Sequence, residues 1–475
     1  MHTIGIDLGA GTAQVGGVVD GEPETVTLGG EREMELAVTF APSDGEVIVG
    51  NSAAEYVETD PGLTVRPLTD ADEALRVAVG GRTFEPPTFL ALLFEQLLAH
   101  AEDSLGGAIE RAVVAVPATC QYHRRERIVR AFRQFDAELQ AIVSRPAAIG
   151  RVRARSADEN GRMLICDFGR QRLETSLVAV RPSGEGPLSE VLTADASDEL
   201  GSERFLESLV NWLAAEFEAD AGVDVSDDSS AIYRLRSKAT AAVDSFFEGS
   251  STERIRAAHL TSDQHLSVDL TRDLLAALTH KLRAGVVSRC LLALDGAETT
   301  TDELDAIRLQ GAPASLVAVR ETLADRLGQT PTAGSDEVPA IGAALVAADL
   351  DRSQTRTADG PGSVLDVAPS SLTAVGPDGS VEPIVERGAP LPTREWCECV
   401  PGARETVRLL RDGERYGDLR GEHDAPLRGV EVVIDASGIV RLRPRTDGDE
   451  IADAIEITGL LDIPAVEPGE LPDVR

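Results

Sequence analysis

Short apolar runs joined by glycine-rich turns open the chain. The run at residues 4–8 contains one charged residue, Asp7; the turn Gly9-Ala10-Gly11-Thr12 follows, and then a second apolar run at residues 13–19. Run lengths and turn residues of this kind predict a β-hairpin. Glycines let the backbone approach a ligand, and an aspartate at a strand end can hold a hydrated Mg²⁺ while turn N–H groups face phosphate. A hairpin with a wide turn and no ligand is the alternative.

The same pattern occurs a second time, with Asp167 standing 160 positions after Asp7. An apolar run at 163–166 leads into Asp167-Phe168-Gly169, and another apolar run follows at 177–180. Two hairpins with this spacing predict a duplicated fold with a nucleotide between its halves.

Longer segments of the chain predict helices and further strands. Apolar residues at helical spacing predict helices at residues 88–104, 122–135, 202–218, 239–247 and 271–294. The charge run His123-Arg124-Arg125 at the start of the second of these helices predicts a solvated face. Residues 112–118 predict a buried strand that stops at a proline, and the alternation of apolar and polar residues at 367–457 predicts an all-β region.

The charge balance of the chain is strongly acidic. The 475 residues include 81 acidic and 45 basic ones, for a net charge of −36, and only Lys238 and Lys281 are lysines. Such a chain disfavours nucleic acid and anionic membranes as partners and is typical of a high-salt cytosol. The absence of any lysine before Lys238 also excludes a P-loop, whose lysine follows a glycine-rich turn.

Compartment and metal chemistry follow from the cysteines and the apolar runs. Five cysteines in a large chain indicate a reducing compartment. We expect Cys397 and Cys399 to be buried apolar positions rather than metal ligands, because no further ligand is nearby. The first residues do not form a signal peptide, and no apolar run reaches membrane-spanning length, so we expect a cytoplasmic protein.

The opening sequence Ile4-Gly5-Ile6-Asp7-Leu8-Gly9 resembles the first phosphate motif of the heat-shock protein 70 (DnaK-like) chaperone family. Later segments that resemble the family in its order are residues 112–118, 200–205, 336–344, 384–393 and 426–440. The resemblance implies an α/β actin-like (ribonuclease H-like, duplicated) ATPase domain of two lobes at 1–352. It also implies a linker at 353–366, a peptide-binding β-sandwich at 367–460 and a tail at 461–475, without the family's helical lid.

The resemblance also implies site residues. Nucleotide contacts are expected at Asp7, Gly9, Ala10, Gly11, Thr12, Asp167, Gly169, Gly201 and Gly311. Asp7 and Asp167 would hold Mg²⁺ through water. Val407 and Leu409, on one face of a strand, are groove candidates, with buried core as the alternative.

Several family positions hold other residues in this chain. The catalytic lysine position falls on Thr69, with Arg66 as a nearby substitute, and Arg145 stands in place of the glutamate that organises Mg²⁺ and water. Replacing a carboxylate by a fixed cation at a metal site is not conservative. The second turn reads Arg170-Gln171-Arg172 where the family has two glycines and a threonine, and the adenosine contacts fall on Thr240, Val243 and Asp244. No catalytic residue is assigned.

The resemblance implies a chaperone that binds apolar segments of unfolded or extended polypeptide clients, with cochaperones and with ATP and Mg²⁺ as cofactors. The altered motifs predict weak or no ATPase activity, since each lost contact weakens binding by about 1 kcal/mol or more. The alternative is a pseudo-ATPase scaffold that binds a protein partner and uses no nucleotide. A sugar-kinase-like enzyme is disfavoured by the C-terminal β region and by the lack of a clear catalytic-base motif.

We expect the folded state to lose stability in dilute buffer. At molar salt the Debye length is about 3 Å, so repulsion among surface carboxylates is largely screened. Millimolar salt leaves the net charge of −36 poorly screened. The melting temperature should therefore fall when KCl is lowered from molar to millimolar, and an unchanged value would contradict the interpretation.

Overall fold

The computed structural model describes residues 2–9, 11–19, 21–40, 47–54, 64–65, 77–79, 82–84, 86–155, 160–183, 186–261, 264–311, 313–352, 363–398, 406–421, 427–446 and 455–458. The chain divides into two compact units. Unit 1 comprises Met1–Asn160, Ala179–Leu192 and Glu337–Arg475, and unit 2 comprises Gly161–Val178 and Thr193–Asp336. Of the expected linker at 353–366, residues 353–362 lie outside the described residues.

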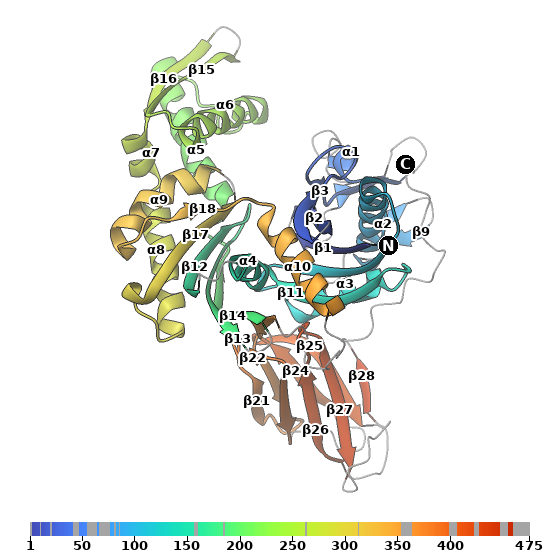
Figure 1. Ribbon diagram of the computed structural model, residues 1–475. Helices are drawn as coiled ribbons and strands as arrows, with labels where there is room; N and C mark the ends of the chain where they lie inside the picture. Colours follow the sequence, from blue (N-terminus) through green and yellow to red (C-terminus); the bar gives the residue numbers. More distant parts are fainter. Residues whose placement is uncertain are drawn as a thin grey trace. The chain divides into compact units, whose positions relative to one another are not determined.

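A six-stranded sheet forms the N-terminal part of unit 1 (Figure 1). Its order is β11-β10-β1-β2-β3, with β4 paired to β2. The strands are β1 (His2–Leu8), β2 (Thr12–Val19), β3 (Glu22–Val26), β4 (Met34–Glu35), β10 (Ile109–Val116) and β11 (Glu138–Ser144). Strands β1, β10 and β11 are parallel, and β1 and β2 are antiparallel, which confirms the first predicted hairpin.

Helices pack on this sheet, and small sheets flank it. The helices are α1 (Asn51–Ala54), α2 (Pro86–Leu105), α3 (Tyr122–Phe132), α4 (Arg145–Arg153) and α10 (Val338–Arg352). The short strands are β5 (Val38–Phe40), β6 (Val47–Val49) and β7 (Thr64–Val65) in one sheet and β8 (Val77–Val79) and β9 (Arg82–Phe84) in another. The apolar face of α2, predicted from its periodicity, joins one core with β1 and β10, and Phe94 meets Phe132 of α3 edge-on at 5.1 Å.

Unit 2 is built on β12 (Gly161–Phe168), which lies between β13 (Leu173–Ser183) and β17 (Leu304–Gly311), with β18 (Thr332–Ala333) outside β17. The residues of β13 and of β14 (Gly186–Ser197) are shared between the two units. The helices are α5 (Ser202–Ala221), α6 (Ser229–Phe247), α7 (Arg272–Leu278), α8 (His280–Gly296) and α9 (Pro313–Leu327), with a 3-10 turn at Thr301–Glu303.

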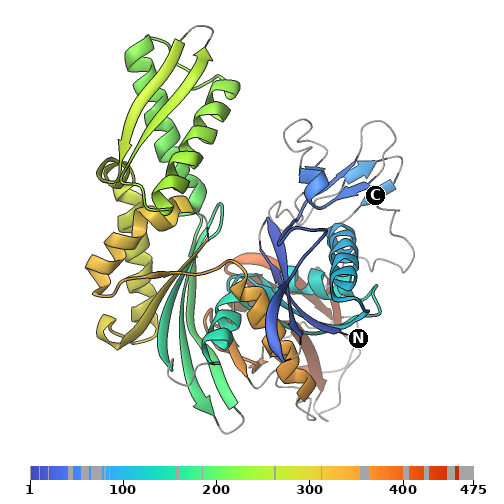
Figure 2. The same ribbon diagram turned by 45° about the horizontal axis from the view of Figure 1, so that its top comes forward.

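Two features of unit 2 differ from the sequence prediction. The helix expected at 271–294 is two helices that meet at Thr279. Thr271 caps the start of α7 by accepting from Leu274 N, and the Thr279 hydroxyl donates to Leu275 O at 2.7 Å. Ahead of them, β15 (Thr252–Thr261) and β16 (Gln264–Thr271) form a hairpin that the sequence analysis did not predict. Figure 2 shows this hairpin on the helices α5 and α6, with which it shares a core.

The C-terminal part of unit 1 contains two antiparallel sheets around one core, as the alternating pattern predicts. The orders are β21-β20-β24-β25-β28 and β23-β26-β27. The strands are β20 (Leu372–Val375), β21 (Val381–Val385), β23 (Thr393–Cys397), β24 (Thr406–Arg411), β25 (Glu414–Gly421), β26 (Leu427–Ile434), β27 (Val440–Thr446) and β28 (Ile455–Thr458). Both sheets contribute side chains to the core. We call the two sheets the C-terminal β-domain.

A short strand precedes the C-terminal β-domain. Strand β19 (Val364–Val367) pairs in parallel with β14 through Ser189 and Glu190, and antiparallel with β22 (Pro390–Leu391). Val364 and Val367 are buried. The end of the expected linker is therefore a sheet strand in this structure.

The charge run at the start of α3 is not a solvated face, contrary to the prediction. Arg125 is fully buried, and His123 is 8% exposed. His123 Nδ1 contacts Arg411 Nη1 of the C-terminal β-domain. An arginine can only donate, so this contact needs a neutral imidazole that accepts at Nδ1. Burial, and then Arg411, Arg127 and Arg124, lower the pKa of His123 to about 3.

The remaining sequence expectations concern metals, thiols and membranes. Cys397 is buried in the core of the C-terminal β-domain, and Cys399 lies outside the described residues. The part of the chain that the structure describes holds no cluster of histidine, cysteine and carboxylate side chains suited to a metal ion. Within the same residues, no helix combines the length and the apolar character needed to cross a bilayer.

A methyl group at Gly16 should destabilise unit 1, whereas one at Gly17 should have little effect. A Cβ at Gly16 would lie 2.6 Å from the Ala340 carbonyl oxygen, but one at Gly17 would lie 3.4 Å from Val26 Cγ2. Overpacking of this kind costs about 1–3 kcal/mol. Urea denaturation of Gly16→Ala and Gly17→Ala in molar KCl measures the difference, and equal losses of stability would contradict the packing argument.

The His123 pKa predicts a loss of stability in mild acid. Between pH 6.5 and about 3 the unfolded chain protonates this imidazole and the folded chain does not. The free energy of unfolding therefore falls as the pH falls through this window, by at most about 1.4 kcal/mol per pH unit, with no contribution above it. His123→Gln should show a shallower pH slope than the wild type between pH 7 and 5, and identical slopes would count against the assignment.

Candidate functional site

We call the residues around Asp7 and those around Asp167 the two candidate half-sites. The first lies at one edge of the N-terminal sheet. Asp7 is the penultimate residue of β1, is 5% exposed, and stands opposite Ala115 of β10 and Gln14 of β2. Because β1, β10 and β11 are parallel, their carboxyl ends meet at this edge, which is where open α/β sheets bind ligands. The sequence analysis placed Asp7 here correctly, at the end of the first strand of a hairpin.

The turn after Asp7 is closed by its own backbone. Gly9 N donates to Thr12 O at 3.0 Å, and Leu36 N donates to Gly11 O at 2.8 Å. The structure thus brings Gly9, Gly11 and Thr12 together beside Asp7, while Ala10 lies outside the described residues. Because the Gly9 N–H is used inside the turn, it does not face a ligand in this structure.

Arg145 enters the half-site from the end of β11, which is separated from β1 by β10. It is the first residue of α4, directly after β11, and Ser144 caps the helix by accepting from Ala147 N at 3.3 Å. Arg145 Nε lies 3.2 Å from Asp7 Oδ1, and the two side chains are 15% and 7% exposed. The sequence identified Arg145 as the replacement for a glutamate, and the structure adds that it forms an ion pair with the aspartate.

A hydrated Mg²⁺ at Asp7, which the resemblance implies, does not fit these residues. Mg²⁺ demands oxygen ligands in near-octahedral geometry and keeps several waters. Here a guanidinium nitrogen lies 3.2 Å from the Asp7 carboxylate oxygen Oδ1. A fixed cation also repels a dication placed beside the same carboxylate.

Gln14 is a polar residue of this half-site that the sequence analysis did not single out. It is 7% exposed, faces Asp7 in the β1–β2 register, and its Oε1 has no hydrogen-bond partner among the described residues. Directly opposed residues of an antiparallel pair share one face of the sheet. The signal available was one amide at the second position of the apolar run at 13–19.

The second candidate half-site lies in unit 2, at the end of β12. Asp167 is 9% exposed and is followed by Phe168 and Gly169. The turn that follows is fastened to the start of α5, since Ser202 N donates to Gly169 O at 2.9 Å and Glu203 N donates to Arg170 O at 2.9 Å. These two hydrogen bonds therefore hold the turn at the N-terminus of α5.

Two predicted glycines of unit 2 allow close backbone contacts around this turn. A Cβ at Gly201 would lie 2.2 Å from the carbonyl carbon of Gln171, and one at Gly311 would lie 2.1 Å from Phe168 O. Gly311 also has φ +102, a conformation that favours glycine. The structure brings Asp167, Gly169, Gly201 and Gly311 together, and it accounts for both Gly201 and Gly311 by packing.

The arginines of the second turn are paired with carboxylates. Arg170 Nε lies 3.3 Å from Glu203 Oε2, and Arg172 Nε forms an ion pair with Asp198 Oδ1. The two arginine side chains are 71% and 42% exposed. They do not form a phosphate cradle in this arrangement, because their guanidinium groups are directed to neighbouring acids.

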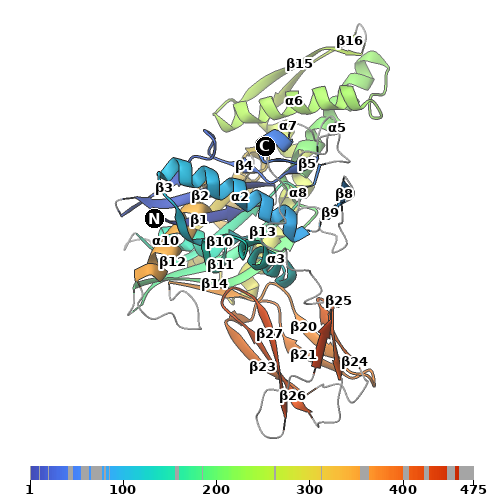
Figure 3. The ribbon, with the colours of Figure 1, turned by 90° about the vertical axis from the view of Figure 1, so that its right-hand side faces the viewer.

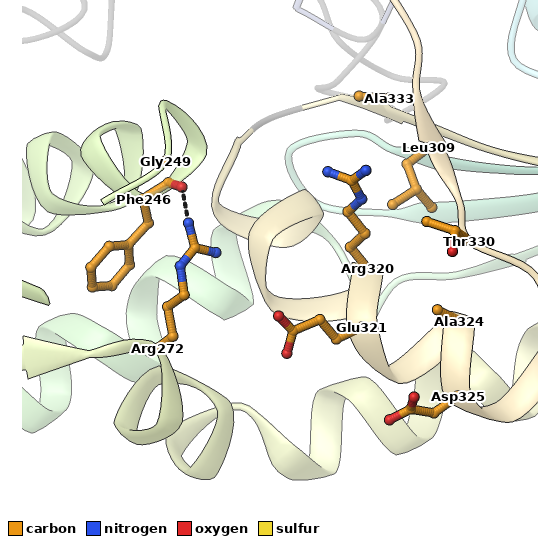
Figure 4. A pocket seen from close by; sticks show the side chains of 10 residues that line it. All are labelled: Phe246, Gly249, Arg272, Leu309, Arg320, Glu321, Ala324, Asp325, Thr330 and Ala333. Carbon is orange, nitrogen blue, oxygen red and sulfur yellow. Dashed lines mark hydrogen bonds between the residues drawn. The ribbon is translucent and has the colours of Figure 1, made fainter. Parts of the chain in front are cut away.

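A cavity of about 530 Å³ lies in unit 2 next to the end of α6 (Figure 4). Figure 4 shows Arg272 with Phe246 on one side of it and Arg320 with Leu309 on the other. Arg272 Nε donates to Ser250 O at 2.9 Å, and its guanidinium lies 5.4 Å from the centre of the Phe246 ring. The lining residues are Phe246, Gly249, Arg272, Leu309, Arg320, Glu321, Ala324, Asp325, Thr330 and Ala333. The volume suits a small molecule, but the α6 positions expected at adenosine, Thr240, Val243 and Asp244, are not among these residues.

The groove candidates of the C-terminal β-domain are core residues in this structure. Val407 and Leu409 lie on the same face of β24, with exposed fractions of 0% and 1%, and both belong to the core cluster shared by the two sheets. The alternative given for Val407 and Leu409, that they are buried core residues, therefore agrees with this structure. Arg66 and Thr69 lie outside the described residues.

Comparison with models of known protein families matches residues 64–400 to the family described as Hsp70 protein. The match covers more than half of the 475 residues. It implies an actin-like ATPase fold, with which the mixed sheets and flanking helices agree, and a chaperone-like function in general. The chain belongs to the Hsp70 family.

Proposed function

We propose that this chain is a chaperone that binds extended apolar segments of unfolded polypeptides and hydrolyses ATP weakly or not at all. The observation that carries the second part is the ion pair between Arg145 and Asp7. Phosphoryl transfer to water depends on a metal ion that neutralises the phosphates and on a positioned nucleophile. The residues at Asp7 do not fit that metal ion, so the chemistry lacks its main electrostatic support.

The charge at the first half-site supports the same conclusion. An aspartate with a bound Mg²⁺ presents a net positive charge to a phosphate, whereas Asp7 with Arg145 sums to zero. In unit 2, Arg170 pairs with Glu203, which also pairs with Arg236, and Arg172 pairs with Asp198. A triphosphate would have to displace these carboxylates. We therefore expect ATP to bind much more weakly than a ligand with a micromolar Kd.

Family membership and the β-domain support the client-binding part of the proposal. The C-terminal β-domain consists of two antiparallel sheets around its own core, the type of scaffold that the family uses for peptides. Val407 and Leu409 are in the core of this domain, so other residues would line a peptide groove. Unfolded polypeptides and cochaperones are the proposed partners, in the cytoplasm, rather than nucleic acid or membranes.

A scaffold that binds a folded protein partner and uses no nucleotide is the second candidate. The pairing of the half-site arginines with carboxylates favours it, because this pairing removes the need for a ligand. A complex with an unfolded model polypeptide, whether or not ATP releases it, would favour the chaperone. A stable complex with a folded partner only, indifferent to nucleotide, would favour the scaffold.

Calorimetry in molar KCl with Mg²⁺ should detect no micromolar ATP binding to the wild type. Asp7→Asn should give the same result, because the wild-type aspartate is already paired with Arg145. Arg145→Glu, which restores the family's carboxylate, should gain affinity for Mg²⁺ alone. Arg133→Glu, at the exposed residue that follows α3, is the control for the same change of charge. Micromolar ATP binding to the wild type that is lost in Asp7→Asn would overturn the proposal.

A further inference from the structure

The first turn of α3 is buried against the C-terminal β-domain, both in unit 1. Figure 3 shows the strands of this domain next to α3. Tyr122 is 1% exposed, its hydroxyl donates to Ser370 O at 2.8 Å, and its ring lies 6.1 Å from that of Tyr416. Tyr122 belongs to the same core cluster as Leu372 and Ile434 of the two sheets. The helix therefore supplies a side chain to the core of the β-domain.

Arg125, one turn further along α3, makes a second buried contact with the β-domain. It is fully buried; its Nε donates to Cys120 O at 3.0 Å and its Nη1 donates to Ser437 O at 3.1 Å. The residue after Ser437 is Gly438, with φ +72, and a Cβ there would lie 2.9 Å from Arg125 Cδ. Glycine at 438 is thus what lets the β-domain turn close over the arginine.

The β-domain and its leading strand also cover the free edge of the N-terminal sheet. Among the strands that the structure describes, β11 is the last in the order, and no described strand pairs with its outer N–H groups. Ser437 Oγ accepts from Ile142 N at 3.0 Å, and Asp366 Oδ2 accepts from Ser144 N at 2.8 Å. Unpaired strand edges promote association with other chains, and here side chains from the C-terminal part of unit 1 take up two of these donors.

We propose that the C-terminal β-domain is a fixed part of the N-terminal lobe and stays docked in the absence of nucleotide. Interfaces between domains that separate are usually polar and resemble transient protein contacts. Here a tyrosine of one part completes the core of the other, and separation would leave a cavity where Tyr122 sits. This inference does not depend on whether ATP binds.

Hydrogen exchange on the full chain in molar KCl tests the proposal. The amide of Ile142 reports docking of the β-domain directly, because its acceptor is Ser437, and the amide of Ser144 reports the position of the leading strand β19, because its acceptor is Asp366. Without nucleotide, both should exchange about a hundredfold or more slowly than in an unstructured peptide, and millimolar ATP with Mg²⁺ should not change the rates. Fast exchange without nucleotide, or protection that appears only with ATP, would overturn the proposal.

A matched pair of glycine variants tests the residues that hold the domain. Gly438→Ala should speed exchange at Ile142 and Ser144 about tenfold or more, because the added methyl group collides with Arg125. Gly379→Ala is the control: it has φ +82 in another β-domain turn, and its Cβ meets no atom within 4 Å. Unchanged exchange in Gly438→Ala would refute the role of the contact between Arg125 and the turn at Gly438. The wild-type measurement decides the proposal even where a variant does not fold.

Discussion

The close approach of α10 to the first hairpin is the constraint on which unit 1 depends. A Cβ at Gly5 would lie 2.0 Å from Ala344 N, and one at Gly342 would lie 2.1 Å from Ala148 O. These two glycines let one helix lie backbone to backbone against both β1 and α4. Since β1 ends beside Asp7 and α4 begins with Arg145, this packing also sets the distance between the two charges. The ion pair is therefore a consequence of the core and does not rest on a mobile loop.

Arginine, and not lysine, is the cation of both half-sites. A lysine presents a compact, strongly hydrated charge on a flexible stem, whereas the guanidinium group is always charged and matches a carboxylate in shape. In a chain with 81 acidic residues, each half-site arginine meets a carboxylate close by. The family positions that hold other residues here, a glutamate in the first half-site and two glycines and a threonine in the second, thus carry arginines that pair with carboxylates.

Much of the fold could be predicted from the sequence because periodicity and turn residues are local signals. The hairpin at Asp7, the helix α2 and the all-β C-terminal region are of this kind. The break at Thr279 depends on one back-donated hydrogen bond to Leu275 O, and the face of α3 depends on Ser437 and Gly438, which are distant in sequence. For the site, the sequence identified Asp7 and Arg145 separately. Their contact could not be read from it, because it depends on how β11 turns into α4.

The turn from β11 into α4 links the half-site to the start of the β-domain. Asp366 of β19 accepts from Ser144 N, and the next residue, Arg145, reaches Asp7. Ser144 also caps α4, so one residue carries both the docking contact and the start of the helix that presents the arginine. One hydrogen bond, the Ser144–Arg145 peptide unit and one ion pair thus connect the carboxylate of the leading strand to the carboxylate of the half-site. A change at either end would have to move this turn, and the turn is buried, with Ser144 fully inaccessible to solvent. The local geometry therefore favours a single arrangement of half-site and docked strand over two alternating ones.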